Sequence, residues 1–193
     1  YDRAAAMFGG ATTAMLVGRD SPTFPQRLFV DLRRANWPVS PVVEGRVVIG
    51  GRVFRLLGIE PVSLPAGAGP APDLARTEPG QTDLHRFIAP PGQTLVAPET
   101  LSDLKSSEGA SPQASGVSLP PLVVQDKLSP GVLIVDIGVA QRILKMPDQI
   151  SRLLVGEMRG KHPSLEQVVG EKLRRVEAGA PSDLERLTAS FHL

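Results

Sequence analysis

The spacing of apolar residues near the start of the chain predicts a helix. Apolar residues recur there every three to four positions, which is typical of one buried helical face. They are Phe24, Leu28, Leu32 and Ala35. Ser21 followed by Pro22 indicates an N-cap with proline at the first helical position, so we expect the helix to begin there. Asn36, which tolerates the left-handed conformation, is expected to end it.

Two apolar segments on either side of a glycine pair predict a β-hairpin. The segments are Val47-Val48-Ile49 and Arg52-Val53-Phe54, and the glycines are Gly50 and Gly51. Two glycines supply the positive φ angles of a tight two-residue turn. This turn sets the register, and we expect Val48 opposite Val53, Val47 opposite Phe54 and Arg46 opposite Arg55.

The rest of the chain alternates between short apolar segments and signals for helix starts, which indicates an α+β protein. Strands are expected at residues 94–96, 122–124, 132–135, 153–155 and 173–176. Helices are expected from about Pro98, from Asp136 to about Lys145, and after capping boxes at residues 164–167 and 182–185. The last helix carries Leu184, Leu187 and Phe191 at helical spacing and is expected to continue to Leu193.

Glycine, proline and charge divide the chain into a frame and a middle segment. Residues 61–131 hold 19 of the 38 glycines and prolines and carry a net charge of −3, whereas residues 1–60 carry +3. Residues 65–72 and 106–116 are the most linker-like. We therefore expect the middle to be an inserted subdomain or a set of long loops.

The overall composition excludes several classes of protein. The net charge of +1 gives no electrostatic reason to expect nucleic acid or an anionic membrane surface as a partner. The absence of cysteine excludes disulfides, thiolate metal sites and a cysteine nucleophile. No run of residues reaches the 18 apolar positions expected of a membrane span.

Asp136 is the most suggestive single residue for chemistry. A buried strand that ends in an aspartate and leads into a helix is one way in which α/β enzymes place a catalytic carboxylate. The alternative is that Asp136 is simply the N-cap of the following helix. No partner carboxylate or nucleophile accompanies Asp136. Residues 67–70 are not a phosphate-binding loop, because they follow no strand and contain proline. The sequence therefore favours the cap.

The histidines and one group of arginines complete the candidate residues. None of the three histidines has a second potential metal ligand at helical spacing, which favours surface histidines over a metal or catalytic site. They are His85, His162 and His192. Arg46, Arg52 and Arg55 lie on the predicted hairpin. Like charges directly opposite one another are unfavourable, so Arg46 and Arg55 require solvent, the default for a strand edge, or an anionic partner.

Several stretches resemble the extracytoplasmic domain of FtsX-like, MacB-type ABC transporter permeases. They are residues 41–61, 94–98, 131–145, 150–155 and 183–193. The resemblance implies an α+β fold in which both flanks of the chain form a porter-like α/β sandwich. The porter-like part with its stalk ends would consist of residues 1–61 and 150–193. A second mixed α+β subdomain, inserted between these two flanks, would consist of residues 62–149.

The same resemblance implies a function without enzymatic chemistry. The domain would lie on the periplasmic or extracellular side of the inner membrane, between membrane helices that precede Tyr1 and follow Leu193. It would couple ATP-driven motion to export or release of a lipid, lipoprotein or peptide, or to an external partner. The implied partners are an ABC ATPase reached through the membrane part, a second permease copy or paralogue, and an extracytoplasmic adaptor or lipoprotein. No cofactor, metal or nucleic acid is implied.

Two alternatives to this function remain open. The chain could be a free-standing periplasmic or secreted protein-binding module, or an α/β enzyme that uses Asp136. Arg46, Arg52 and Arg55 are the candidate partner-interface residues in the permease hypothesis.

Overall fold

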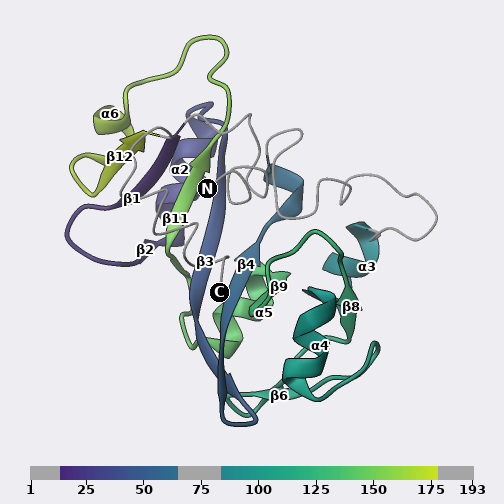
Figure 1. The fold of residues 1–193 in the computed structure, drawn as a ribbon. Coiled ribbons are helices and arrows are strands. Elements are labelled where there is room, and N and C mark those ends of the chain that lie inside the picture. Colours follow the sequence, from purple (N-terminus) through teal and green to yellow (C-terminus); the bar gives the residue numbers. More distant parts are fainter. Residues whose placement is uncertain (1–13, 65–83, 178–193) are drawn as a thin grey trace.

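A computed structural model describes residues 14–64 and 84–177, and most of its strands form one large mixed sheet (Figure 1). The strands are β1 Ala14–Gly18, β2 Phe24–Pro25, β3 Val39–Ile49, β4 Arg52–Ile59, β5 Thr94–Val96, β6 Gln113–Ala114, β7 Val117–Ser118, β8 Leu122–Val124, β9 Val132–Asp136, β10 Gln149–Ile150, β11 Arg152–Val155 and β12 Leu173–Glu177. The helices are α2 Gln26–Arg34, the 3₁₀ turn η1 Pro61–Ser63, α3 Leu84–Ile88, α4 Pro98–Leu104, α5 Ile137–Ile143 and α6 Leu165–Val169. This confirms the predicted α+β class.

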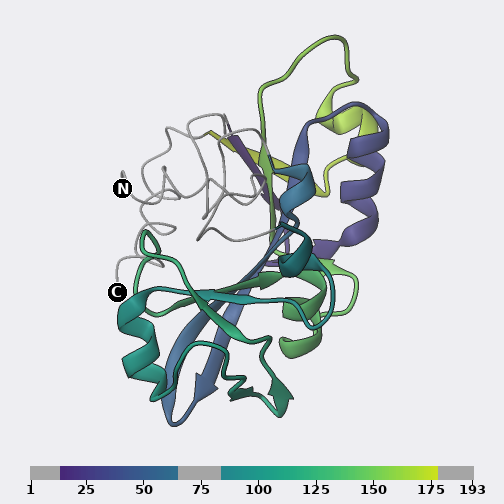
Figure 2. The same ribbon diagram turned by 90° about the vertical axis from the view of Figure 1, so that its right-hand side faces the viewer.

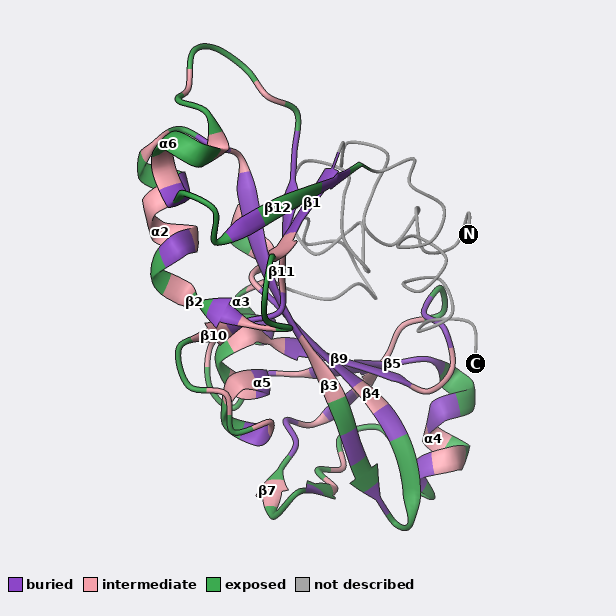
Figure 3. Cartoon of the chain, turned by 90° about the vertical axis from the view of Figure 1, so that its left-hand side faces the viewer, coloured by how far each residue is buried: buried purple, intermediate pink, exposed green. Residues whose placement is uncertain are grey.

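The main sheet has eight strands in the order β12-β1-β11-β3-β4-β9-β5-β8. The pairs β4–β9 and β5–β8 are parallel, and the other neighbours are antiparallel. β2 pairs with β10, and β6 with β7, in two small additional sheets. Helices α2, α6 and α5 lie along one side of the main sheet (Figures 2 and 3).

The predicted hairpin is confirmed, including its register. Val48 pairs with Val53, Val47 with Phe54 and Arg46 with Arg55. The turn glycines have φ angles of 58° and 80°, as a tight two-residue turn requires. β3 and β4 are the longest strands among the described residues, and their hairpin extends beyond the neighbouring strands to an exposed end (Figure 3).

The buried side chains form three apolar clusters on the two faces of the sheet. The flank cluster includes Leu28, Leu32 and Leu153 and packs α2 and α6 against β1, β11 and the start of β3. The insert cluster, which includes Leu133 and Val135, packs α5 against the hairpin and β9. The central cluster covers the opposite face. Val42 belongs to it, whereas Val43, the next residue of β3, belongs to the insert cluster, and consecutive side chains of a strand point to opposite faces.

The start of the first described helix differs from its prediction. Helix α2 begins at Gln26, with Pro25 as its N-cap, and Ser21 is not its cap. Phe24 precedes a proline and is therefore biased toward extended backbone, and it pairs with Ile150 in a short strand. Asn36 has a φ of 68° just beyond the helix, which confirms the predicted left-handed terminator.

The remaining predicted elements fall close to their observed positions. The strands expected after residues 94, 122, 132, 153 and 173 are present as β5, β8, β9, β11 and β12. Helix α4 starts at Pro98, α5 ends at Ile143, and α6 has the predicted capping box of Ser164 and Gln167. The predicted helix at residues 182–193 lies outside the described residues.

The sheet runs without interruption across the predicted division into two subdomains. β4 belongs to the predicted porter-like part, yet it pairs with β9 of the predicted insert over five residue pairs. The flank cluster is built only from residues of the two flanks, whereas the insert cluster combines the hairpin with residues 96–146. The division at residues 61 and 150 therefore stays a prediction. The β3–β4 hairpin links the two parts, and so does the central cluster, which joins Met15 and Leu154 to Leu95.

Candidate functional site

The β3–β4 hairpin places two of the three candidate arginines on one face of the sheet. Arg46 and Arg55 are a directly opposed pair, so their side chains leave the sheet on the same side. Arg52 lies three positions before Arg55, and alternation directs it toward the other side. Arg52 forms an ion pair with Asp103 of α4 at 3.2 Å. The structure therefore separates Arg52 from the other two.

Glu44 supplies an anionic partner for Arg55, one of the two opposed arginines. Its Oε2 atom lies 3.4 Å from Nη1 of Arg55, and its Oε1 atom accepts a hydrogen bond of 2.9 Å from Nη2 of Arg152. Arg152 comes from β11, where it pairs with Val42. We call Arg55 and Arg152, which both contact Glu44, together with Arg46 opposite Arg55, the arginine cluster.

The arginine cluster is partly withdrawn from solvent. The side chains of Glu44, Arg55 and Arg152 are 11%, 20% and 22% exposed, whereas Arg46 is exposed. The Nε atoms of Arg55 and Arg152 are buried and have no hydrogen-bond partner. Oε2 of Glu44 is likewise buried without a hydrogen-bond partner, and the two arginines that contact this carboxylate leave an excess of one positive charge.

The exposed end of the hairpin is apolar next to the cluster. Val48 and Val53 face each other across the strands and are 57% and 60% exposed. Along the same face of β3, the side chains change from buried Val42, through Glu44 and Arg46, to exposed Val48. The hairpin therefore presents a charged strip between the buried core and an apolar end.

Sequence reasoning identified Arg46 and Arg55 but not their partners. Glu44 stands two positions before Arg46, so strand alternation places both on one face, and this signal was available in the sequence. Arg152 reaches the cluster only through the pairing of β11 with β3, which joins segments more than 100 residues apart. The solvated interpretation holds for Arg46 and Arg52, which are exposed at the protruding end of the hairpin, but not for Arg55, which is 20% exposed and paired with Glu44.

Asp136 is the N-cap of α5, as the sequence favoured. Its Oδ2 atom accepts a hydrogen bond of 3.2 Å from the backbone amide of Gly138. Burial raises the pKa of Asp136 above its ordinary value of 3.8, nearby Glu60 adds to the rise, and the amides of Gly138 and Ile137 oppose it. A hollow of about 450 Å³ lies along α5, lined by Gly138, Gln141, Arg142, Lys145, Pro147 and Asp148. Asp136 is not part of its wall.

The described histidines lie apart from the arginine cluster. His85 is in the short helix α3. The ring of His162 meets the ring of Trp37 edge to face at 5.1 Å, and Nε1 of Trp37 donates to the carbonyl of Pro163 at 2.9 Å. These contacts attach the loop before α6 to the end of α2. His192 and residues 67–70 lie outside the described residues.

Neither a metal site nor a membrane-spanning helix is found in the described part of the chain. Residues 14–64 and 84–177 contain no group of three or more His, Asp or Glu side chains able to hold a metal ion. Within the same ranges, no helix combines the length and the apolar character needed to cross a bilayer.

Comparison with solved structures places the chain in a class of folds. Its fold is that of extracytoplasmic domains of ABC transporters, which confirms the resemblance drawn from the sequence at the level of the fold. The extracellular domain of the noncanonic ABC-type transporter YknZ from Gram-positive bacteria matches with a TM-score of 0.55 at 12% identity, over 86% of this chain and 100% of that one. The periplasmic region of MacB from Actinobacillus actinomycetemcomitans matches with a TM-score of 0.55 at 11% identity, over 96% and 95%. No family model and no curated protein sequence matches the chain.

Proposed function

We propose that this chain is the extracytoplasmic domain of an ABC transporter permease and has no enzymatic activity of its own. The observation that carries the proposal is the likeness of fold to two such domains over 86% and 96% of the chain. The domain would lie on the periplasmic or extracellular side of the inner membrane. It would couple ATP-driven motion of the membrane part to export or release of a lipid, lipoprotein or peptide, or to an external partner.

The arrangement of the two ends of the described sheet supports this coupling. β1 is the first described strand and β12 the last, and they are antiparallel neighbours in which Ala14 pairs with Glu177. The chain therefore enters and leaves the sheet at the same place. A displacement applied there would move the sheet as a unit, since packed interiors transmit strain rather than absorb it.

The partners follow from the proposed role. An ABC ATPase would act through the membrane part, together with a second permease copy or paralogue. An external adaptor or lipoprotein would meet the domain at the hairpin, where Arg46 and Arg52 are exposed beside Val48 and Val53. Arg55 would contribute less to that contact directly, because it is engaged with Glu44. The domain itself would need no cofactor.

The reading frame that encodes the chain provides the first test. Extending it by some 40 residues on each side should reveal apolar runs of about 20 residues, the length of a membrane helix. The longer protein should then fractionate with the membrane and co-purify with an ATPase encoded beside it. Ordinary domain boundaries with a stop codon, and a soluble longer product, would contradict the proposal and favour a free-standing binding module.

A further inference from the structure

The main sheet ends on one side in a strand whose outer edge has no partner in the described part of the chain. This strand is β12, and its neighbour in the sheet is β1 (Figure 1). At the other end of the sheet a loop covers β8, because Gly109 and Ala110 exchange backbone hydrogen bonds with Leu122. Within residues 14–64 and 84–177, β12 has no such cover. An uncovered strand edge is a template for pairing with a further strand.

The hydrogen bonds between β12 and β1 determine which backbone groups of β12 face outward. Arg19 donates its amide to the carbonyl of Lys172 at 3.0 Å, one position beyond the paired residues. In an antiparallel ladder, hydrogen-bonded and non-hydrogen-bonded pairs alternate, so the next residues of β12 that bond to β1 are Arg174 and Val176. The remaining residues direct their amides and carbonyls away from β1, where no hydrogen-bond partner for them is present among the described residues. They are Leu173, Arg175 and Glu177.

The side chains along this edge make it complementary to itself. Nε of Arg175 lies 2.7 Å from Oε1 of Glu177, and the two side chains are 37% and 65% exposed. Consider a second β12 that runs antiparallel along the edge, with Val176 opposite its own copy. Each Arg175 then stands opposite the Glu177 of the other copy, and these are residues whose backbone groups face outward. The charges and the backbone hydrogen bonds therefore agree in one register.

The neighbouring registers of such a pairing are unfavourable. A two-fold pairing centred on Arg174, Arg175 or Glu177 places that charged residue directly opposite its own copy, and like charges in this position are destabilising. Among the registers centred on residues 174–177, only the one centred on Val176 avoids this repulsion. The same charges that disfavour indiscriminate pairing of the edge thus favour one specific partner strand.

We propose that β12 pairs edge to edge with β12 of a second copy of this chain, in the antiparallel register centred on Val176. The contact is isologous, as in most homodimers, and it continues the main sheet from one copy into the other. Because it covers few residues, it is weaker than an interface of standard size. The pairing does not depend on the proposed transporter function, so its failure would leave that proposal standing.

Sedimentation equilibrium of the 193-residue chain tests the pairing. The chain should associate reversibly to a dimer as its concentration rises. Arg175→Glu places two acidic side chains opposite each other and should weaken the dimer about tenfold. Glu177→Arg places two arginines opposite each other and should weaken it to the same degree. A chain that stays monomeric at every soluble concentration would overturn the proposal.

An equal mixture of the two variants distinguishes a contact between chains from an effect within one chain. In a mixed dimer, the acidic edge of Arg175→Glu meets the basic edge of Glu177→Arg at both charged positions. The mixture should therefore dimerise about as strongly as the unmodified chain, although neither variant does so alone. Loss of the ion pair within each chain cannot be repaired by mixing, so an absence of recovery would contradict the proposed register.

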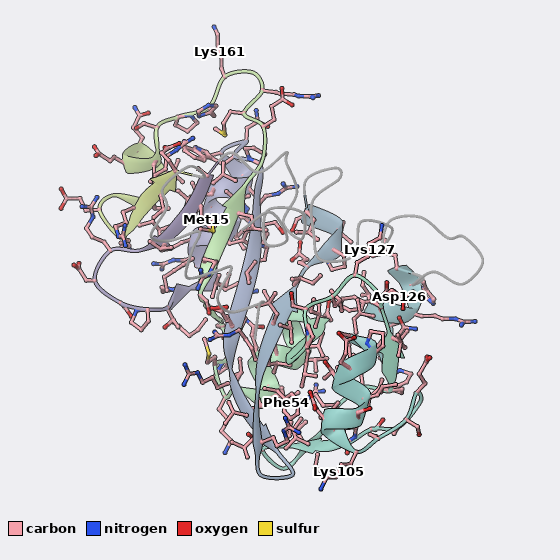
Figure 4. All side chains as sticks on the ribbon, viewed as in Figure 1. Met15, Phe54, Lys105, Asp126, Lys127 and Lys161 are labelled. Carbon is pink, nitrogen blue, oxygen red and sulfur yellow. The ribbon has the colours of Figure 1, made fainter. Side chains whose placement is uncertain are left out.

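Arg159→Glu is the matched control for the change in charge. Arg159 also forms an ion pair with a residue two positions away, Glu157, at 3.0 Å, and the two side chains are 81% and 66% exposed. They lie in the loop before α6, from which Lys161 projects into solvent (Figure 4). This variant should dimerise like the unmodified chain. A tenfold loss in this control as well would show that the association responds to net charge rather than to β12, against the proposal.

Amide hydrogen exchange of the unmodified chain provides a test that does not depend on whether the variants fold. The outward amides of Arg175 and Glu177 should become protected as the concentration rises, because they bond to the second copy only in the dimer. The amides of Arg174 and Val176, which bond to β1, should be protected at every concentration. Exchange at Arg175 and Glu177 that is independent of concentration would rule out pairing through this edge.

Discussion

At the scale of single residues, Asp136 shows how one carboxylate can suggest chemistry and serve structure. It follows the buried strand β9, where a catalytic acid of an α/β enzyme would stand, yet its oxygen is occupied by the amide of Gly138. Burial nonetheless raises its pKa, which is often a mark of functional carboxylates. Its titration can therefore be predicted without assigning it a reaction.

Asp136→Asn should change the pH dependence of stability in a defined direction. Asparagine caps helices about as well as aspartate, so the cap is retained. Because the pKa of Asp136 is raised in the folded protein, the unfolded chain releases its proton first as the pH rises. The wild-type chain should therefore lose stability relative to Asp136→Asn as the pH rises from about 3.8 through the higher pKa of the folded state.

Urea unfolding of both proteins between pH 3 and pH 7 checks this expectation. The difference in unfolding free energy should grow in favour of asparagine across the acidic range and then level off near neutral pH. A difference that is independent of pH would contradict it. Asp136→Ala provides the control for the cap itself and should cost about 1 kcal/mol.

Residue-scale prediction from the sequence succeeded where the governing interactions are local. The opposition of Arg46 and Arg55 follows from a two-residue turn between them, and the Asp136 cap follows from its immediate neighbours. The contact of Glu44 with Arg152 could not be predicted, because it depends on which distant strand lies beside β3. The sequence therefore predicted Arg46 and Arg55 of the candidate site but not their partners Glu44 and Arg152.

At the scale of elements, the packing of α5 on the sheet depends on a residue without a side chain. A Cβ atom on Gly58 of β4 would lie 2.4 Å from Cβ of Ala140 and 3.1 Å from Cα of Ile137. The first distance is far below van der Waals contact, and the second neighbour is backbone. Gly58 therefore sets how closely helix and sheet approach.

Gly58→Ala should destabilise the protein by about 1–3 kcal/mol, the usual cost of overpacking a filled core. The matched control is Gly138→Ala in α5, the helix that packs on Gly58. Its Cβ would meet only Oδ2 of Asp136, at the ordinary distance of 3.5 Å, and alanine is the better helix residue. Chemical denaturation should show a lower midpoint for Gly58→Ala and an unchanged or higher one for Gly138→Ala. Equal midpoints would refute this account of the packing.

Helix α2 shows why the boundaries of elements are harder to predict than their existence. Its apolar spacing identified the helix, but Ser21–Pro22 gave a false start signal. The amide of Gln26 is satisfied instead by the carbonyl of Asp148, at 2.8 Å. This backbone bond comes from a segment more than 100 residues away, so no local pattern could reveal it.

At the scale of the whole molecule, one sheet connects the parts that composition separated. The shift in glycine, proline and charge suggested two subdomains, and the flank cluster and insert cluster correspond to them in part. β3, one strand of the long hairpin, nevertheless contributes to both clusters, with Val39 in the flank cluster and Val43 and Val47 in the insert cluster. If the domain transmits motion, this shared hairpin should make it respond, and unfold, as one unit.

Paired core truncations test whether the domain is one cooperative unit. Trp37, the only tryptophan of the chain, lies in the flank cluster, so its fluorescence reports that part alone. Leu133→Ala, in the insert cluster, should cost about 2–5 kcal/mol and shift the Trp37 transition in urea as far as the far-UV circular dichroism transition. Leu153→Ala, in the flank cluster, is the matched control and should also move both signals together. If Leu133→Ala shifts the circular dichroism transition and leaves the Trp37 transition in place, the subdomains unfold independently and the sheet does not couple them.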